Sequence, residues 1–183
     1  MTIHDHGYWI GPPNGEHHFD KPLADALVEL LRGHSVLDVG CGMGEYVHVL
    51  RRAGIEAAGV DGNPDTPYLT RWQCCVADLV EPWPASWPYW ETVLCLEVLE
   101  HIPHTLEEIA VHNVCDYCGK RLILSWAVRG QDGTGHVNCR TKDYVETRIS
   151  AQGFVFDVAA TETLRSKATL PWFQNNLLVF NRC

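Results

Sequence analysis

The chain alternates short apolar runs with longer stretches in which apolar residues recur every three or four positions. The short runs predict seven strands, at residues 35–39, 56–61, 73–79, 92–98, 121–127, 154–159 and 176–182. Helical periodicity is found at residues 21–32, 45–54, 103–115 and 141–153. Strands that alternate with helices in this way are typical of a parallel sheet with right-handed helical crossovers.

The ends of two predicted helices carry capping signals. Asp20 precedes the first helix as its N-cap, and Pro22 lies in its first turn. Thr141 can cap the fourth helix and Gly153 can end it. Residues 63–71 are few and interrupted by proline, which argues against a stable helix there.

The last two predicted strands are joined by residues 160–175, which show no clear crossover helix. Without a crossover, two strands that follow each other pair antiparallel more readily than parallel. The sequence therefore predicts a single α/β domain with a seven-stranded, mostly parallel, doubly wound sheet whose last strand is antiparallel.

Composition and charge narrow the class of protein. The 183 residues, 46% of them hydrophobic, fit one domain with a full core. The net charge of −9 and the absence of a dense Lys or Arg run argue against a nucleic-acid partner. No apolar run approaches the roughly 18 residues of a membrane span, and the first residues lack a leader pattern, so we expect a soluble cytoplasmic protein.

The eight cysteines do not change this expectation. A chain of this size needs no disulfide to stabilise its core. Cys41, Cys75 and Cys95 lie inside apolar strand-like runs, where a thiol packs as a small hydrophobic group. We expect all the cysteines to be reduced.

The glycine-rich stretch "VLDVGCGMGEY", residues 36–46, follows the first predicted strand. Gly40, Gly42 and Gly44 are spaced G-x-G-x-G, whereas a dinucleotide-binding turn is spaced G-x-G-x-x-G. Asp38 precedes them at the strand end, where its carboxylate would repel a pyrophosphate and attract an ammonium group. This turn therefore favours S-adenosylmethionine as the ligand.

Two further acids follow the next two predicted strands. Asp61, in "GVDGN", can accept hydrogen bonds from both hydroxyls of the adenosine ribose. Asp78, in "VADL", can accept one from the adenine amino group. Each acid by itself could be a turn or loop residue, but together they fit one ligand. The predicted cofactor-binding residues are Asp38, Gly40, Cys41, Gly42, Gly44, Asp61, Gly62, Asn63, Ala77, Asp78, Leu79 and Glu97.

With "VLDVGCGMG", "GVDGN", "VADL" and "VLCLEVLEHIP", the chain resembles the class I, Rossmann-like S-adenosylmethionine-dependent methyltransferases over about residues 30–130. The resemblance implies helices on both faces of a seven-stranded sheet and an acceptor bound beside the methyl group at the strand ends. It also implies an N-terminal segment that folds over the cofactor. We therefore divide the chain into an arm or lid, residues 1–20, and a methyltransferase domain, residues 21–183.

The segment "LEVLEHIP" places Glu97, Glu100 and His101 at i, i+3 and i+4. On a helical turn these side chains share one face, as a hard-metal site or an acid/base pair. The segment resembles the ubiquinone-pathway O-methyltransferases, for which a divalent metal is implied. The alternative, which we favour over a metal, has Glu97 accepting from backbone amides near the cofactor, Glu100 solvated, and His101 capping or packing on the next helix. A catalytic role for His101 stays open.

The loop after the fifth predicted strand, "SWAVRGQDGTGHVNCR", contains His136 and Asn138. With an ordinary pKa of about 6.5, an imidazole can take a proton from an acceptor near neutral pH. His136 is therefore a candidate general base, and a turn residue before the next helix is the alternative. Trp126 and the segment "LPWF", residues 170–173, either pack in the core or wall an acceptor site.

Other histidines and cysteines are weaker candidates. His17 or His18 could contact cofactor or acceptor, whereas His4 and His6 suit an exposed arm equally well. The segment "HNVCDYC" offers His112, Cys115 and Cys118, but no second pair at zinc spacing follows. On a helix the two thiols would share the buried face, and we expect no zinc.

The predicted reaction is an in-line transfer of the sulfonium methyl group to an O or N atom of a small molecule, with His136 and His101 as candidate catalytic residues. The chain has almost no insertion beyond the minimal fold, which favours a small acceptor over a macromolecule. Monomer and homodimer both stay open. The alternative function is a non-catalytic partner or regulatory subunit that still binds the cofactor.

Overall fold

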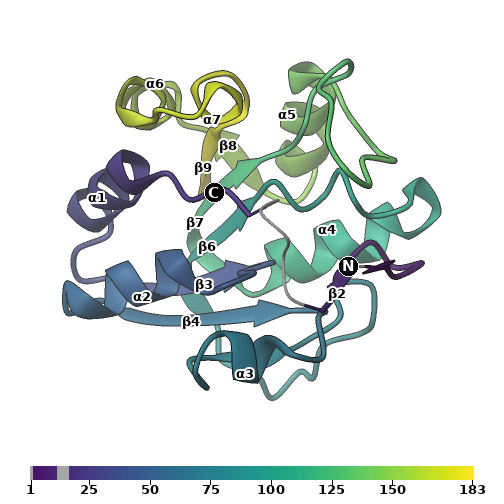
Figure 1. The fold of residues 1–183 in the computed structure, drawn as a ribbon. Coiled ribbons are helices and arrows are strands. Elements are labelled where there is room, and N and C mark those ends of the chain that lie inside the picture. Colours follow the sequence, from purple (N-terminus) through teal and green to yellow (C-terminus); the bar gives the residue numbers. More distant parts are fainter. Residues whose placement is uncertain (1, 12–16) are drawn as a thin grey trace.

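The computed structural model describes residues 2–11 and 17–183. Its main sheet has seven strands in the order β5-β4-β3-β6-β7-β9-β8 (Figure 1). The strands are β3 (Ser35–Val39), β4 (Glu56–Asp61), β5 (Cys74–Val76), β6 (Trp90–Leu96), β7 (Cys118–Ser125), β8 (Phe154–Phe156) and β9 (Leu178–Arg182). Only β9 runs antiparallel, between β7 and β8, and the rest are parallel. The predicted seven-stranded sheet with an antiparallel last strand is confirmed.

Helices cover both faces of the sheet. They are α1 (Lys21–Leu30), α2 (Glu45–Arg52), α3 (Thr66–Leu69), η1 (His104–Leu106), α4 (Glu107–Asp116), α5 (Lys142–Ser150), α6 (Val158–Lys167) and α7 (Pro171–Asn176). Buried residues of α1, α2, α6 and α7 form one apolar core with the sheet, and those of α4 and α5 form the other. Asp20 accepts from Leu23 N at 3.0 Å, and Thr141 accepts from Tyr144 N at 3.3 Å, so both predicted caps are confirmed.

The prediction of a loop over residues 160–175 is wrong, because α6 and α7 occupy most of it. Of α6 only Thr161 and Leu164 are buried, so the helix has almost no apolar periodicity to detect. Its start is marked instead by Asp157, which accepts from Ala160 N at 2.9 Å. The antiparallel pairing of β8 with β9 is nevertheless confirmed.

Smaller departures have local causes. The short helix α3 forms although proline interrupts it, since Pro67 lies in the first turn, where its missing N–H costs nothing. Every cysteine of the chain is a free thiol. Cys41 and Cys95 are buried as expected, but Cys75 is exposed. Cys118 is the first residue of β7 and so does not share a helix face with Cys115.

The N-terminal arm contains a two-stranded antiparallel sheet, β1 (Thr2–Ile3) with β2 (Trp9–Ile10). The arm meets the turn after β6 so closely that a Cβ atom at Gly7 would lie 2.3 Å from the His101 carbonyl oxygen. Glycine is required there, also because its φ is +94°. The arm is thereby held against the carboxyl ends of the central strands.

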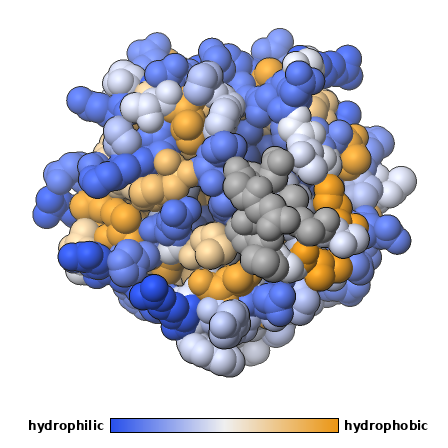
Figure 2. Space-filling model, viewed as in Figure 1, coloured by the Kyte–Doolittle hydropathy of each residue, from blue (hydrophilic) through white to orange (hydrophobic). Residues whose placement is uncertain are grey.

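Polar and apolar side chains are interspersed over the face seen in Figure 2. Among residues 2–11 and 17–183, no helix combines the length and the apolar character that a membrane crossing requires.

Candidate active site

A cavity of about 350 Å³ opens at the carboxyl ends of the central strands. From β3 the chain continues to β4 and β5 on one side and then returns to β6 on the other. Such a reversal leaves a crevice at the strand ends, where open α/β sheets bind ligands. Thirteen of the predicted site residues line this cavity: Asp38, Gly40, Cys41, Gly42, Asp61, Gly62, Asn63, Ala77, Asp78, Leu79, Glu97, His101 and His136.

Gly44 does not line the cavity, and its role as a ligand contact stays a prediction. It is the N-cap of α2, with φ +71°. A Cβ atom there would lie 3.2 Å from Cys74 Sγ and from Thr70 Cγ2. The glycine therefore allows close packing of α2 against the sheet.

Asp38 is buried at the end of β3, with 3% of its surface exposed. Its Oδ2 atom has no hydrogen-bond partner within the described chain. Burial, with smaller contributions from Cys74 and Asp61, raises the pKa of this carboxyl well above its usual range. A carboxylate in this position is stable only beside a positively charged or hydrogen-bond-donating ligand.

Asp61 ties the glycine-rich loop to the end of β4. Its Oδ2 accepts from Gly42 N at 3.0 Å, and its Oδ1 accepts from Asn63 N at 2.9 Å. Each carboxylate oxygen has a further lone pair, so both can still accept from a ligand hydroxyl. The same hydrogen bonds hold the carboxylate in a fixed orientation.

The arm covers this side of the cavity with three side chains. His6 Nδ1 lies 2.6 Å from Asp78 Oδ2, and the Tyr8 ring packs against Gly62. The His17 ring packs so closely on Gly42 that a Cβ atom there would lie 1.6 Å from Nε2.

Of the four arm histidines, His6, His17 and His18 line the cavity. The alternative of an exposed His6 is therefore wrong, since the ring is half-buried against Asp78. His4 lies outside the cavity and stacks on Tyr8, with ring centroids 4.4 Å apart.

Residues 97–103 form turns and not a helix, so the predicted common helical face is absent. Glu97 has a φ of +54°, a left-handed conformation that is uncommon outside glycine. The alternative to a metal site, with Glu97 on backbone amides and Glu100 in solvent, is also wrong. Glu97 Oε2 accepts from the side chain of Gln131 at 2.6 Å, and Glu100 is fully buried where solvent exposure was expected. The His101 ring lies beside those of Trp9 and His136, with centroids 5.7 Å and 5.0 Å apart.

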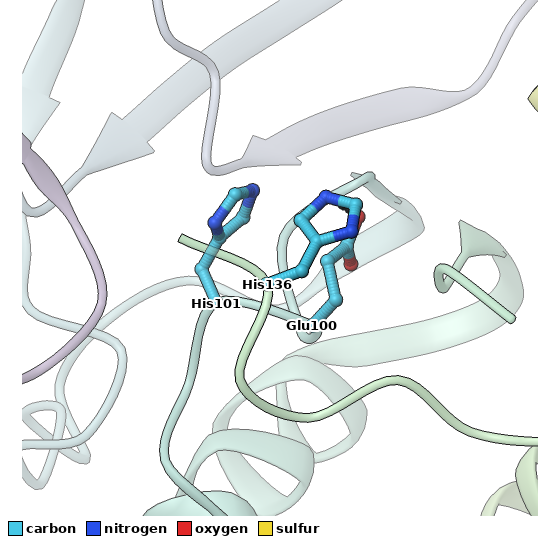
Figure 3. Close-up of side chains that lie close together, drawn as sticks. All are labelled: Glu100, His101 and His136. Atoms are coloured by element: carbon cyan, nitrogen blue, oxygen red, sulfur yellow. Dashed lines mark ion pairs between the residues drawn. The ribbon is translucent and has the colours of Figure 1, made fainter. Parts of the chain in front are cut away.

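Glu100, His101 and His136 come together beside the cavity, as Figure 3 shows. His136 Nε2 lies 3.9 Å from Glu100 Oε1, and the two imidazole centroids are 5.0 Å apart. Burial and the neighbouring His136 lower the pKa of His101 to about 4. His101 is therefore a weak base at neutral pH.

The ligand atoms of these three residues all lie within 4.8 Å of one another. They supply one carboxylate and two imidazole nitrogens, and Glu97 is not a member of the group. Mg²⁺ prefers sites built mainly of oxygen ligands. The group thus does not fit the hard divalent cation that the resemblance implies.

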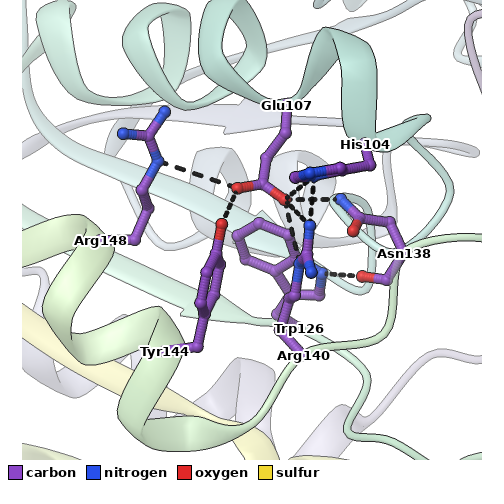
Figure 4. A network of polar contacts seen from close by, with 7 residues as sticks. All are labelled: His104, Glu107, Trp126, Asn138, Arg140, Tyr144 and Arg148. Atoms are coloured by element: carbon purple, nitrogen blue, oxygen red, sulfur yellow. Dashed lines mark hydrogen bonds and ion pairs between the residues drawn. The ribbon is translucent and has the colours of Figure 1, made fainter.

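A second polar cluster, the Glu107 network, anchors the loop that carries His136 (Figure 4). Glu107 Oε2 accepts from Asn138 Nδ2 at 2.9 Å and from Arg140 Nη2 at 2.7 Å, and Oε1 accepts from the Tyr144 hydroxyl. Asn138 N also donates to the Glu100 carbonyl at 2.9 Å. Asn138 is therefore a buried anchor of the loop and does not line the cavity.

Aromatic side chains complete the far wall of the cavity. Trp172 and Phe173, from the "LPWF" segment, line it, whereas Trp126 is buried in the core and donates to the Asn138 carbonyl. The sequence analysis missed Trp9 and Gln131, which also line the cavity. Only their positions in the sequence could have indicated them, since Trp9 lies in the predicted arm and Gln131 lies beside the glycines of the loop after β7.

Cys115 lies in α4, and Cys118 is the first residue of β7. Burial raises the pKa of Cys115 to about 12 and that of Cys118 to about 11. Across residues 2–11 and 17–183, no group of three metal-ligating side chains includes either thiol.

Comparison with known proteins places these features in a family. A family model described as "Methyltransferase domain" matches residues 16–124. The ubiquinone biosynthesis O-methyltransferase of Paracidovorax citrulli is 36% identical over 89 residues, 40% of this chain and 35% of that protein. The enzyme of the same name from Methylococcus capsulatus is 30% identical over 122 residues, 58% of this chain and 51% of that protein. The chain thus spans about a third to a half of the length of these relatives.

Solved structures share the fold. Magnesium protoporphyrin IX methyltransferase from Synechocystis PCC 6803 with bound SAH superimposes with a TM-score of 0.66 at 19% identity, covering 87% of this chain and 82% of that one. The sugar N-methyltransferase from Streptoalloteichus sp. ATCC 53650 gives 0.67 at 16% identity, covering 88% and 87%. Because the family model matches more than half of the chain and the fold agrees, the chain belongs to the methyltransferase-domain family, with the class I S-adenosylmethionine-dependent fold.

Proposed function

We propose that this protein binds S-adenosylmethionine in the cavity and transfers its methyl group to an O or N atom of a small-molecule acceptor. One observation carries the proposal. Asp38, Asp61 and Asp78, from the ends of three adjacent parallel strands, line a single cavity beside a glycine-rich loop.

The groups of the cofactor fit these acids one by one. The unpartnered Oδ2 of Asp38 would receive the ammonium group, and the oriented carboxylate of Asp61 would receive the ribose hydroxyls. Asp78, with Ala77 and Leu79 beside it, would receive the adenine. Glycine is required at position 40, because a Cβ atom there would lie 2.4 Å from Val98 Cγ2 in the cavity wall.

The strand order supports one side of the cavity as the place where the acceptor binds. With ribose and adenine over β4 and β5, the methyl group would face β6 and the loop after β7. The cofactor supplies an electrophilic methyl group on a sulfonium. The chain's own residues hold the acceptor in line, and His136 takes its proton where the accepting atom carries one. His101 lines the same end and orients acceptor or base.

The position of His136 supports this role. Its Nδ1 lies 3.2 Å from the Gln131 carbonyl oxygen, which makes Nδ1 the donor and leaves Nε2 to accept a proton. Gly133 packs against the ring so closely that a Cβ atom there would lie 2.3 Å from Nε2. The loop thus holds the imidazole in one orientation.

We further propose that residues 1–20 act as a lid and 21–183 as the methyltransferase domain. The contacts of His6, Tyr8 and His17 with the cavity support the lid. The cavity volume of about 350 Å³ supports a small acceptor. Free thiols throughout support a reducing, cytoplasmic location.

Calorimetry with S-adenosylmethionine tests the proposal. Asp61→Ala should weaken binding by about 1.5–3 kcal/mol, because charge-assisted hydrogen bonds to the ribose are lost. Asp25→Ala, on the exposed face of α1, is the matched control and should bind like the parent. Equal binding by the Asp61 variant, or displacement by a nicotinamide dinucleotide, would contradict the cofactor assignment. Binding without turnover over an acceptor library would favour a regulatory subunit.

A further inference from the structure

The charges around the cavity are of one sign. Six carboxylates line it: Asp38, Glu45, Asp61, Asp78, Glu97 and Asp132. No described Lys or Arg side chain lines it, and residues 1 and 12–16 contain neither residue type. If three of these acids hold the cofactor, the acceptor end keeps Glu97 and Asp132 with no fixed cation opposite them.

Glu97 is held in place through one carboxylate oxygen, whereas the other has no hydrogen-bond partner in the described chain. Gln131 donates to its Oε2 at 2.6 Å and in turn accepts from the Asn176 amide, so the carboxylate cannot turn away. Its Oε1 atom is buried and has no partner within the described chain. An anchored carboxylate with one free, buried oxygen is suited to a ligand that brings a donor and a positive charge.

Glu100 is a second acidic side chain close to Glu97. It is fully buried, and both of its carboxylate oxygens lack a partner in the described part of the chain. Burial, and then the charge of Glu97, raises its pKa well above the usual range. A cation bound in front of the two carboxyl groups would relieve this repulsion, and an anion would increase it.

The remaining walls at this end are aromatic. The Trp9 ring lies against His101, and Trp172 lies 5.3 Å from the His18 ring, centroid to centroid. Both tryptophans line the cavity. Indole faces attract organic cations and bury flat apolar groups, so they suit an amine with an aromatic or aliphatic body.

We propose, resting on the function above, that the acceptor is an organic amine that enters as its ammonium ion and pairs with Glu97. The ammonium passes one proton to His136 Nε2. The neutral nitrogen then forms a bond to the methyl carbon as the carbon–sulfur bond breaks, and the electron pair of that bond stays on sulfur. The methyl transfer moves the positive charge from sulfur to nitrogen, so the N-methylated product forms as an ammonium ion that pairs with Glu97 until it leaves, and His136 releases its proton to water.

Binding of matched probes to the full chain saturated with S-adenosylhomocysteine tests this inference without requiring turnover. Each set keeps the skeleton and changes the charge: tryptamine, tryptophol and indole-3-acetate, and phenethylamine, 2-phenylethanol and phenylacetate. Calorimetry should show each amine binding about tenfold or more tighter than its alcohol, and no binding of the carboxylates. Glu97→Gln should remove the advantage of the amines, whereas Glu29→Gln, on the exposed surface of α1, should keep it.

Four outcomes overturn the inference while leaving the cofactor assignment intact. These are carboxylates that bind as tightly as amines, no binding by any probe, an amine preference that survives Glu97→Gln, and catechol binding that requires added Mg²⁺. Failure of S-adenosylhomocysteine to bind at the outset overturns the proposed function itself, and this inference with it.

Discussion

Replacing Glu107 removes the charge at the centre of the network that anchors the His136 loop. The side chain of Glu107 is 4% exposed, and that of its partner Arg140 is 16% exposed. Removing one member of such a pair leaves the other as a poorly solvated charge, at a cost of about 3–5 kcal/mol. Glu107→Ala should therefore lower the melting temperature by roughly 6–20 °C for a domain of this size.

Glu107→Gln separates charge from shape. The amide oxygen still accepts from Asn138 or Tyr144, so the loss should be smaller, about 1.5–3 kcal/mol. Glu108→Gln, on the exposed neighbouring residue of α4, is the matched control and should melt like the parent. In Arg140→Met, the further substitution Glu107→Gln should cost less than in the parent, because the two side chains interact directly.

The pH dependence of this effect has a definite sign. Burial by itself would raise the pKa of Glu107, but hydrogen bonds from Tyr144, Asn138 and Arg140 outweigh it and lower the pKa below the ordinary 4.5. A lowered folded pKa stabilises the protein above the unfolded pKa, and this stabilisation is lost as the pH falls through the folded value. The parent and Glu107→Gln should therefore converge in melting temperature as the pH falls below about 4.5.

Thermal denaturation followed by circular dichroism between pH 3.5 and 8 measures both effects, a range that brackets roughly the ordinary carboxyl titration. If Glu107→Gln melts with the parent at pH 7, or if the difference grows as the pH falls, the Glu107 network is not the anchor described above.

Three further predictions concern the cavity. His136→Ala should lower kcat about 10²- to 10⁴-fold in a methyl-transfer assay and leave the affinity for S-adenosylmethionine nearly unchanged. His136→Gln should be equally slow, because an amide cannot take a proton. Parent-like turnover in both variants would exclude His136 as the general base. Dialysis against a chelator should leave turnover unchanged, because the cluster of Glu100, His101 and His136 offers a divalent cation only one carboxylate. A loss of turnover that added Mg²⁺ restores would contradict this prediction. Gly42→Ala should lower cofactor affinity measured by calorimetry, because φ is +51° and the new Cβ would meet His17, whereas Gly54→Ala, also at positive φ but facing open space, should not.

The sheet was predictable because its central strands are buried on both faces and therefore read as continuous apolar runs. The cavity residues that end those strands were predictable for the same reason. A correct strand end places Asp38, Asp61 and Asp78 at one edge of the sheet without further information. Helix α6 escaped detection because it buries little apolar surface and depends on contacts distant in sequence, such as Thr161 accepting from Val179 N.

The acceptor end was less predictable, since its geometry depends on backbone conformation and tertiary contacts. The left-handed φ of Glu97 breaks the helical spacing on which a shared face with Glu100 was inferred. His6 meets Asp78 across 72 residues of sequence, and no periodicity encodes such a pairing. His136 was chosen as a candidate from its chemistry and lines the cavity, but the neighbouring Glu100, which is buried, was expected in solvent.

The arm contacts described above also have a kinetic consequence. His6, Tyr8 and His17 contact Asp78, Gly62 and Gly42, which are predicted cofactor contacts, so the arm would compete with the cofactor for these positions. The apparent dissociation constant of the cofactor is then its intrinsic value divided by the fraction of molecules in which the arm has opened. The arm must leave these positions before the cofactor enters, so shortening it should raise the apparent affinity, chiefly through faster association.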